Sequence, residues 1–280
     1  MTPALSLILP ANNEEAHIGA CLQAVLASDS LACDAPVQIV VVPNGCSDAT
    51  AQIARSYQAK ANARGWQLDV IELDQGSKIA ALNAGEAAAR APAFVYLDAD
   101  VIVSPALLAQ TADALDADDA RYVSGQVQLS TSPSFATRAY GAFYLHTPFM
   151  RQCAPGCGYF AMNNAGRTRW VDWPAIISDD TFARLNFAPD ERQQVSAPYE
   201  WPLVEGLRNL VRVRRRQNAG VEEIEQRFPD LFKNDAKTRF KPAAIVNAAV
   251  RHPIGFLIYG IVALVVKISP ARNSEWKRGR

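Results

Sequence analysis

The chain has 280 residues, of which 49% are hydrophobic and 20% are charged, so it can form one large globular domain or two modest ones. Lys and Arg together number 28, Asp and Glu also number 28, and the formal net charge is zero. No long basic tract is present. The charge balance therefore gives no support to a nucleic-acid partner, and we expect none.

The cysteines and the first residues indicate the compartment. Of the five cysteines, only Cys153 and Cys157 are close together, and no His or Cys lies at zinc-site spacing from them. A reduced, cytosolic setting is the simpler interpretation. The chain enters an apolar run almost at once, without the basic and long apolar regions of a signal peptide. We therefore expect a cytoplasmic protein, with peripheral binding to the inner face of the plasma membrane as an extension of that expectation.

Short apolar runs alternate with helical periodicity through the first half of the chain. Five runs have the length and composition of buried strands: 5–9, 37–42, 68–73, 94–98 and 122–129. Helices are expected between them, at 18–26, after Ser47 or Asp48, at 78–90, and from Ser104-Pro105, with Ser104 as N-cap. This order predicts an α/β fold with a doubly wound, mostly parallel sheet flanked by helices. No Gly-X-Gly-X-X-Gly or Gly-Lys-Ser/Thr motif is present, which argues against a dinucleotide dehydrogenase and a P-loop nucleotidase.

The pattern changes after Pro133. An amphipathic helix is predicted at 135–144, a glycine-rich aromatic segment follows at 155–160, and Ser178 can cap a short helix that ends at Leu185. Several arginines then cluster between residues 208 and 216. They could form a solvated face or bind a diphosphate.

The most apolar sector lies near the C-terminus. Residues 254–266 carry no charge, whereas Arg251 and Lys267 flank them and four further Lys and Arg follow by residue 280. A membrane span needs about 20 apolar residues, so this run is short for one. Two interpretations stay open: a helix buried against the domain, and an interfacial helix on an anionic leaflet.

Two carboxylates, Asp98 and Asp100, stand at the end of the strand predicted at 94–98. Ligands of open α/β sheets bind outside the carboxyl ends of the strands, and acidic side chains there can hold a divalent cation that in turn holds phosphate oxygens. An Asp-X-Asp alone is equally compatible with loop or capping residues. A second acidic pair, Asp179 and Asp180, follows, and repulsion between neighbouring acids can raise the pKa of one of them.

Five segments occur in a characteristic order: residues 10–15 (PANNEE), 44–50 (NGCSDAT), Lys78 with 81–85 (ALNAG), 98–100 (DAD) and 178–180 (SDD). In this order they resemble the family 2 glycosyltransferases, which have the GT-A fold. The resemblance covers roughly the first two thirds of the chain. It departs where Asn12 replaces a frequent Tyr and where Pro43-Asn44 replaces two acids. The Gln-X-X-Arg-Trp motif of processive synthases is also absent, so we expect a non-processive enzyme.

The resemblance implies a transfer, with inversion, from a nucleotide-diphospho-sugar to an acceptor hydroxyl on a glycan, a lipid or a small molecule. It assigns donor binding to Pro10, Ala11, Asn13, Glu15, Asn44, Lys78, Asp98, Ala99 and Asp100. Asp100 would ligate Mg²⁺ or Mn²⁺, which would stabilise the leaving diphosphate, and Asp180 would be the general base. Acceptor or diphosphate contacts are expected from Gly158, Tyr159, Asp179 and Arg212.

By the same resemblance, residues 1–130 form the donor-binding half of one domain, residues 131–241 form the acceptor and catalytic half, and residues 242–280 form an apolar and basic helical extension. Two alternatives remain. A sugar-1-phosphate nucleotidyltransferase would have a glycine-rich, basic first loop, whereas residues 10–15 are acidic. A non-catalytic nucleotide-sugar-binding protein would not need Asp98, Asp100 and Asp180, all of which are present.

Overall fold

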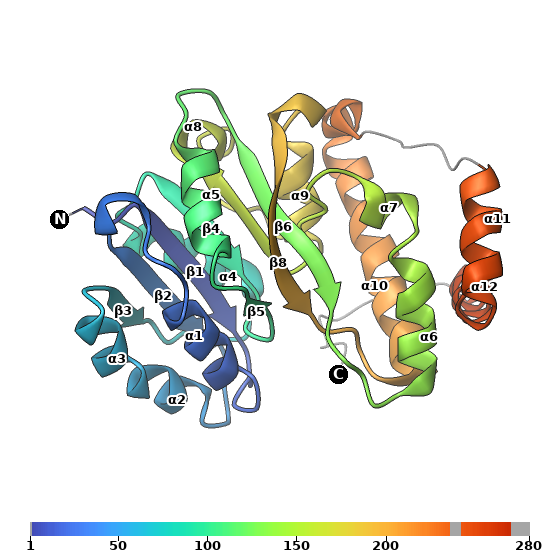
Figure 1. Ribbon diagram of the computed structural model, residues 1–280, viewed down its shortest axis with the longest axis horizontal. Helices are drawn as coiled ribbons and strands as arrows, with labels where there is room; N and C mark the ends of the chain where they lie inside the picture. Colours follow the sequence, from blue (N-terminus) through green and yellow to red (C-terminus); the bar gives the residue numbers. More distant parts are fainter. Residues whose placement is uncertain (1, 236–241, 270–280) are drawn as a thin grey trace.

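The computed structural model describes residues 2–235 and 242–269, which form a curled sheet flanked by helices (Figure 1). The strands are β1 Leu5–Ala11, β2 Val37–Pro43, β3 Gln67–Val70, β4 Ala93–Leu97, β5 Ile102–Val103, β6 Tyr122–Leu129, β7 Tyr159–Asn163 and β8 Arg192–Trp201. The helices are α1 Ile18–Leu26, α2 Thr50–Ser56, α3 Gln58–Ala63, α4 Lys78–Ala88, α5 Leu107–Leu115, α6 Phe135–Tyr144, α7 Pro148–Arg151, α8 Asn164–Arg167, α9 Asp179–Leu185, α10 Gly206–Arg227, α11 Pro242–Arg251 and α12 Pro253–Ile268. The predicted α/β class is confirmed.

The sheet is parallel in its first half and mixed in its second. In the described residues its strand order is β3-β2-β1-β4-β7-β6-β8-β5. Strands β3, β2, β1 and β4 run parallel, as the alternating pattern predicts. Strand β7 then inserts antiparallel between β4 and β6, with Tyr96 opposite Phe160. The glycine-rich aromatic segment thus leads into a strand that the sequence analysis did not recognise.

One predicted helix start was wrong. Helix α5 begins at Leu107, its N-cap is Ala106, and no side-chain cap is made. Ser104 acts instead through its backbone, because its carbonyl accepts a hydrogen bond from the amide of Leu107 at 3.1 Å. Residues 104–106 therefore form a turn before the helix.

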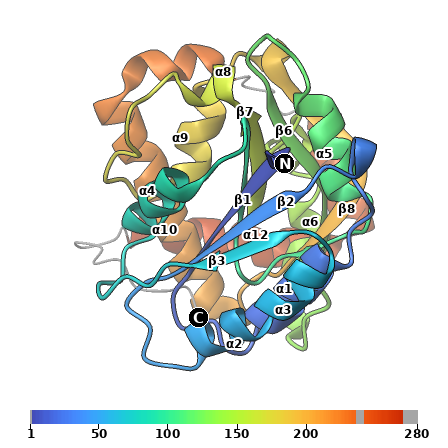
Figure 2. The ribbon, with the colours of Figure 1, turned by 90° about the vertical axis from the view of Figure 1, so that its left-hand side faces the viewer.

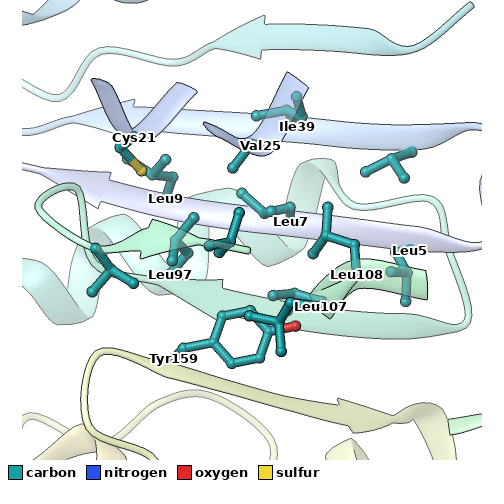
Figure 3. Packing of buried hydrophobic residues seen from close by; sticks show 14 of the residues in the cluster. Leu5, Leu7, Leu9, Cys21, Val25, Ile39, Leu97, Leu107, Leu108 and Tyr159 are labelled. Atoms are coloured by element: carbon teal, nitrogen blue, oxygen red, sulfur yellow. The ribbon is translucent and has the colours of Figure 1, made fainter. Parts of the chain in front are cut away.

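Helices cover both faces of the sheet (Figure 2). On one face Leu7 and Leu9 of β1 pack in a cluster with Val25 of α1 and Leu107 of α5 (Figure 3). On the other face α4 lies very close to β1, since a Cβ added to Gly85 would lie 2.6 Å from Ile8 Cγ2. This close approach brings Lys78, the first residue of α4, towards the carboxyl ends of the parallel strands.

Helix α12 packs on α6 and α10. The ring of Tyr259 stacks on Tyr140 and Tyr144, with centroids 5.5 and 6.4 Å apart, and Val262 is buried beside them. The opposite side of α12 is exposed, so the apolar run is buried against the domain on one face only. No single helix in the described ranges is long and apolar enough to cross a membrane, and α11 and α12 qualify only as a pair bent by 114°.

Candidate active site

A pocket of about 280 Å³ opens where β1, β2 and β4 end. The residues around it come from strand ends on one side and from α6, α9 and α10 on the other. The predicted site residues that line it are Pro10, Asn44, Lys78, Asp98, Ala99, Asp100, Gly158, Asp179 and Asp180. The fold thus brings together motifs that are distant in the sequence.

Lys78 lies between two carboxylates from different elements. Its Nζ is 2.9 Å from Oδ1 of Asp98, after β4, and 3.0 Å from Oδ2 of Asp179, the first residue of α9. Desolvation works against the ammonium charge, but Asp179 and Asp98 outweigh it and raise the pKa of Lys78 above its usual range. The side chain therefore stays cationic at neutral pH and holds the two carboxylates together.

The environment of the pocket changes the pKa of Asp180. Desolvation, followed by repulsion from Asp179, raises its pKa, and the nearby ammonium of Lys78 opposes that rise. The Thr181 amide donates a hydrogen bond to its Oδ1 at 2.7 Å. A carboxylate with a raised pKa is a stronger base once ionised, which suits it to proton abstraction.

Helix α10 positions the start of α9. Ser178 makes no side-chain cap; instead α10 approaches so closely that a Cβ on Gly220 would lie 2.4 Å from the Oγ of Ser178. Glu223 of the same helix accepts a hydrogen bond from the Ile177 amide at 2.9 Å. These contacts fix the segment that carries Asp179 and Asp180.

Asn44 explains one departure from the usual family pattern. Its Nδ2 donates to the carbonyls of Ala11 at 2.9 Å and Val42 at 3.2 Å, and its Oδ1 accepts from the Ser77 amide at 3.0 Å. An aspartate could not donate either of the first two bonds. The amide side chain therefore ties together the ends of β1 and β2 and the start of α4.

Five other predicted site residues do not line the pocket. Ala11 is buried, the Oδ1 of Asn13 accepts a hydrogen bond from the Ser47 amide at 2.7 Å, and the Oε2 of Glu15 accepts one from the Ala49 amide at 3.1 Å. Tyr159 is buried, with its hydroxyl 2.7 Å from that of Thr111, and Arg212 is exposed on α10. The first three shape the loops around the pocket, where Asn12 and Glu14 line the cavity instead.

The sequence analysis did not assign the wall opposite the strand ends. This wall includes Tyr140 and Tyr144 of α6, and Leu210, Val213, Arg214, Arg216 and Gln217 of α10. The spacing of residues 210, 213, 214 and 217 follows one face of a helix, and this periodicity was the available signal. Within the arginine cluster the helical periodicity distinguishes Arg214, which lines the pocket, from Arg212, which is exposed to solvent.

The acidic side chains fit a divalent cation that arrives with a substrate. The described ranges contain no group of three or more His, Cys, Asp or Glu side chains that could hold a metal ion by themselves. Mg²⁺, however, is commonly held by one or two carboxylates together with substrate phosphates and water. Asp98 and Asp100 line the same pocket, at the end of β4, and carry oxygen atoms of this kind.

The family model described as glycosyl transferase family 2 matches residues 6–188, which include all the predicted motifs. The chain belongs to this family. One relative, the 4,4'-diaponeurosporenoate glycosyltransferase of Staphylococcus aureus strain USA300, is 34% identical to this chain over 101 residues. That alignment covers 35% of this chain and only 24% of the relative.

Solved glycosyltransferase structures share the GT-A fold with this family 2 chain. S. aureus TarS in complex with UDP aligns with a TM-score of 0.54 at 14% identity, over 99% of this chain and 95% of that one. Mannosyltransferase PcManGT from Pyrobaculum calidifontis, in complex with GDP-Man and Mn²⁺, aligns with a TM-score of 0.57 at 17% sequence identity. This alignment covers 97% of this chain and 77% of that one. Glucosyl-3-phosphoglycerate synthase from Mycobacterium tuberculosis, in complex with Mn²⁺, UDP and glucosyl-3-phosphoglycerate, aligns with a TM-score of 0.51 at 20% sequence identity. This alignment covers 81% of this chain and 80% of that one.

Proposed function

We propose that this protein is a non-processive, inverting glycosyltransferase that moves a sugar from a nucleotide-diphospho-sugar to an acceptor hydroxyl. The observation that carries the proposal is the position of Lys78 between Asp98 and Asp179, in one pocket with Asp100 and Asp180. Membership of family 2, and the nucleotide or nucleotide-sugar bound in the three solved structures, support it.

The strand-end side of the pocket is assigned to the donor. Pro10, Asn12 and Asn44 line this side and would bind the nucleoside, and Lys78 and Asp98 line it and would bind the diphosphate and the sugar. Asp100, with Asp98 beside it, would hold Mg²⁺ or Mn²⁺, which when bound acts as a Lewis acid on the leaving diphosphate. On this assignment residues 1–130 form the donor-binding half and residues 131–241 form the acceptor half.

Asp180 is assigned the role of general base. Its carboxylate takes the proton of the acceptor hydroxyl as the new bond forms between that oxygen and the anomeric carbon. The bond from the anomeric carbon to the diphosphate oxygen breaks, and its electron pair leaves with the nucleoside diphosphate. A single displacement of this kind inverts the anomeric centre. The environment of Asp180, with its raised pKa, supports this role.

A thermal-shift screen of UDP- and GDP-sugars, each with Mn²⁺ and with EDTA, tests the proposal. We expect at least one donor to raise the unfolding midpoint with Mn²⁺ and to have little effect with EDTA, because ligands that bind the folded state stabilise it. Stabilisation by nucleoside triphosphates, with release of pyrophosphate from the triphosphate when a sugar 1-phosphate is added, would favour a nucleotidyltransferase instead. Donor binding without any transfer or hydrolysis would indicate a non-catalytic binding protein.

A further inference from the structure

The outer face of α12 carries a stripe of exposed apolar side chains. Ile254, Leu257, Ile261, Leu264 and Ile268 recur every three or four residues, which places them on one side of the helix. Leu257 is 62% exposed and Leu264 is 59% exposed, and α11 adds the exposed Val246 and Val250. Soluble monomers rarely expose an apolar patch of this extent, so such a patch marks a binding surface.

The charge of the surrounding sequence favours one class of partner for this surface. Residues 236–280 contain nine Lys and Arg and a single acid, Glu275, although the whole chain is balanced at 28 of each sign. Among the described residues, Arg251 and Lys267 are exposed at the two ends of α12. An apolar helix face flanked by basic residues is the pattern of a helix that lies on an anionic lipid surface.

The inner face of the same helix forms the support of the catalytic pocket. Tyr259 of α12 stacks on Tyr140 and Tyr144, and both of those rings line the pocket. Arg214, another lining residue, donates a hydrogen bond from Nη2 to the Tyr259 hydroxyl at 3.3 Å. A single helix therefore separates the pocket wall from the exposed stripe.

The pocket wall that α12 supports is largely apolar. Tyr140, Tyr144, Phe149, Leu210 and Val213 line it beside the polar Arg214, Arg216 and Gln217, whereas the acidic residues lie at the strand ends and at the start of α9. A molecule with a hydroxyl at one end and an apolar body matches this division, because each part meets surface of its own kind.

We propose that α11 and α12 dock on an anionic lipid bilayer and that the acceptor is a lipid of that bilayer, whose hydroxyl reaches Asp180. The proposal of docking depends only on the exposed apolar and basic residues of α11 and α12. The proposal of a lipid acceptor also rests on the proposed glycosyltransferase function. Docking through the outer face of α12 would place the apolar side of the pocket one helix away from the membrane, so that the acceptor need not leave the bilayer completely.

Vesicle flotation of the full chain tests the docking. We expect flotation with vesicles of phosphatidylglycerol and phosphatidylcholine, weaker flotation at high salt, and little with phosphatidylcholine alone. The double variant Leu257→Glu, Leu264→Glu should lower the bound fraction at least about tenfold, because it puts charge into the lipid-facing stripe. Val171→Glu is the matched control, since Val171 is 88% exposed but lies outside α11 and α12. Arg251→Glu, Lys267→Glu tests the charge separately and leaves the apolar contacts intact.

Three results would overturn the docking. They are no flotation of the full chain, a bound fraction that falls as much in Val171→Glu as in Leu257→Glu, Leu264→Glu, and equal binding to charged and neutral vesicles. Sedimentation velocity without lipid provides a further check. A dimer that the Leu257→Glu, Leu264→Glu variant converts to monomer would show that the stripe is an interface between copies of this chain.

Labelled donor tests the acceptor class. With vesicles of a total lipid extract, wild-type protein should transfer label into the organic phase, and the Leu257→Glu, Leu264→Glu variant should lose most of this transfer. Label that stays in the aqueous phase, as donor, free sugar or soluble product, would contradict a lipid acceptor. Calorimetric donor binding by the same variant should be unchanged, which separates a failure of this inference from a failure of the donor assignment.

Discussion

Lys78 Nζ lies 3.0 Å from Oδ2 of Asp179, and this ion pair joins the first residue of α4 to the first residue of α9. The same ammonium contacts Asp98 at 2.9 Å. One cation thus holds the carboxylate that follows β4 next to the acidic pair that contains the proposed base. Its charge also affects the protonation of Asp180, because it lowers the pKa that desolvation and Asp179 raise.

Lys78→Gln should therefore shift the pH dependence of the reaction. Without the ammonium the pKa of Asp180 rises further, so the acid limb of kcat/KM should move to higher pH, since kcat/KM reports groups of the unbound enzyme. The maximal value should fall by about 10²-fold, as for the loss of other electrostatic groups at active sites. Lys60→Gln is the control, because Lys60 is an exposed lysine near the ring of Tyr57. An acid limb that stays in place would disprove the electrostatic role of Lys78.

Asp179→Asn should move the acid limb in the opposite direction. Repulsion from Asp179 is one of the causes that raise the pKa of Asp180, so its removal should lower that pKa and extend activity to lower pH. The measurement is the kcat/KM profile beside that of the wild type. A shift to higher pH would show that Asp179 acts mainly by holding Lys78.

Asp180→Asn should abolish base catalysis and leave the donor site intact. The amide keeps the size of the side chain but cannot accept the hydroxyl proton, so turnover should fall by about 10²–10⁴. Donor affinity, measured by calorimetry, should barely change, because the base acts on the acceptor. Near-normal turnover in this variant would remove the assignment of Asp180.

Glu86 bonds to Tyr96, a residue that lines the pocket, and replacing its carboxylate should destabilise the fold. Its carboxylate accepts hydrogen bonds from Arg167 Nε at 2.7 Å, from the Tyr96 hydroxyl at 2.5 Å and from the Trp173 indole. Glu86→Gln takes the carboxylate away from the Arg167 guanidinium, which keeps its bonds to the carbonyls of Trp170 and Val171. Both side chains of the pair are only 11% exposed, so the free energy of unfolding should fall by about 3 kcal/mol. Glu72→Gln, which breaks an exposed pair with Arg55, should cost at most about 1 kcal/mol. Urea unfolding of both variants measures the difference, and equal losses would contradict this account.

Arg212 and Arg216 provide a comparison on one helix. Arg216 lines the pocket and Arg212 is exposed on the outside of α10. If the α10 arginines bind the diphosphate, Arg216→Gln should weaken nucleoside diphosphate binding by about tenfold or more, because a charge-assisted hydrogen bond contributes about 1.5–3 kcal/mol. Arg212→Gln should have little effect. Titration calorimetry of both variants tests this, and a larger loss in Arg212→Gln would reverse the assignment.

The sequence predicts the strand-end side of this pocket better than the opposite side, for a physical reason. Pro10 lies at the end of β1, and Asn44 and Asp98 follow β2 and β4, the parallel neighbours of β1. The carboxyl ends of parallel strands meet at one edge of the sheet. Their proximity therefore follows from the strand order. Which side chain of a loop faces the cavity depends on backbone geometry instead, as at Asn13, whose φ of 51° accompanies its bond to Ser47.

The opposite wall depends on packing between elements that are distant in the sequence. Strand β7 inserts between β4 and β6, and no local pattern places it there. Helix α10 contributes pocket residues, and Gly220 lets this helix approach Ser178 closely. Similarly, the C-terminal run has apolar residues on both faces, so its composition could not decide between burial and exposure.

The most direct test of the central claim is a calorimetric titration of UDP and GDP into the wild-type protein and into Asp100→Ala. The account predicts that at least one nucleotide binds the wild type with Mn²⁺, that EDTA removes this binding, and that Asp100→Ala shows the same loss with Mn²⁺ present. Asp118→Ala, an exposed acid in the loop after α5, should bind as the wild type does. Binding of neither nucleotide, or equal affinity in wild type and Asp100→Ala, would contradict a cation-assisted nucleotide-sugar site.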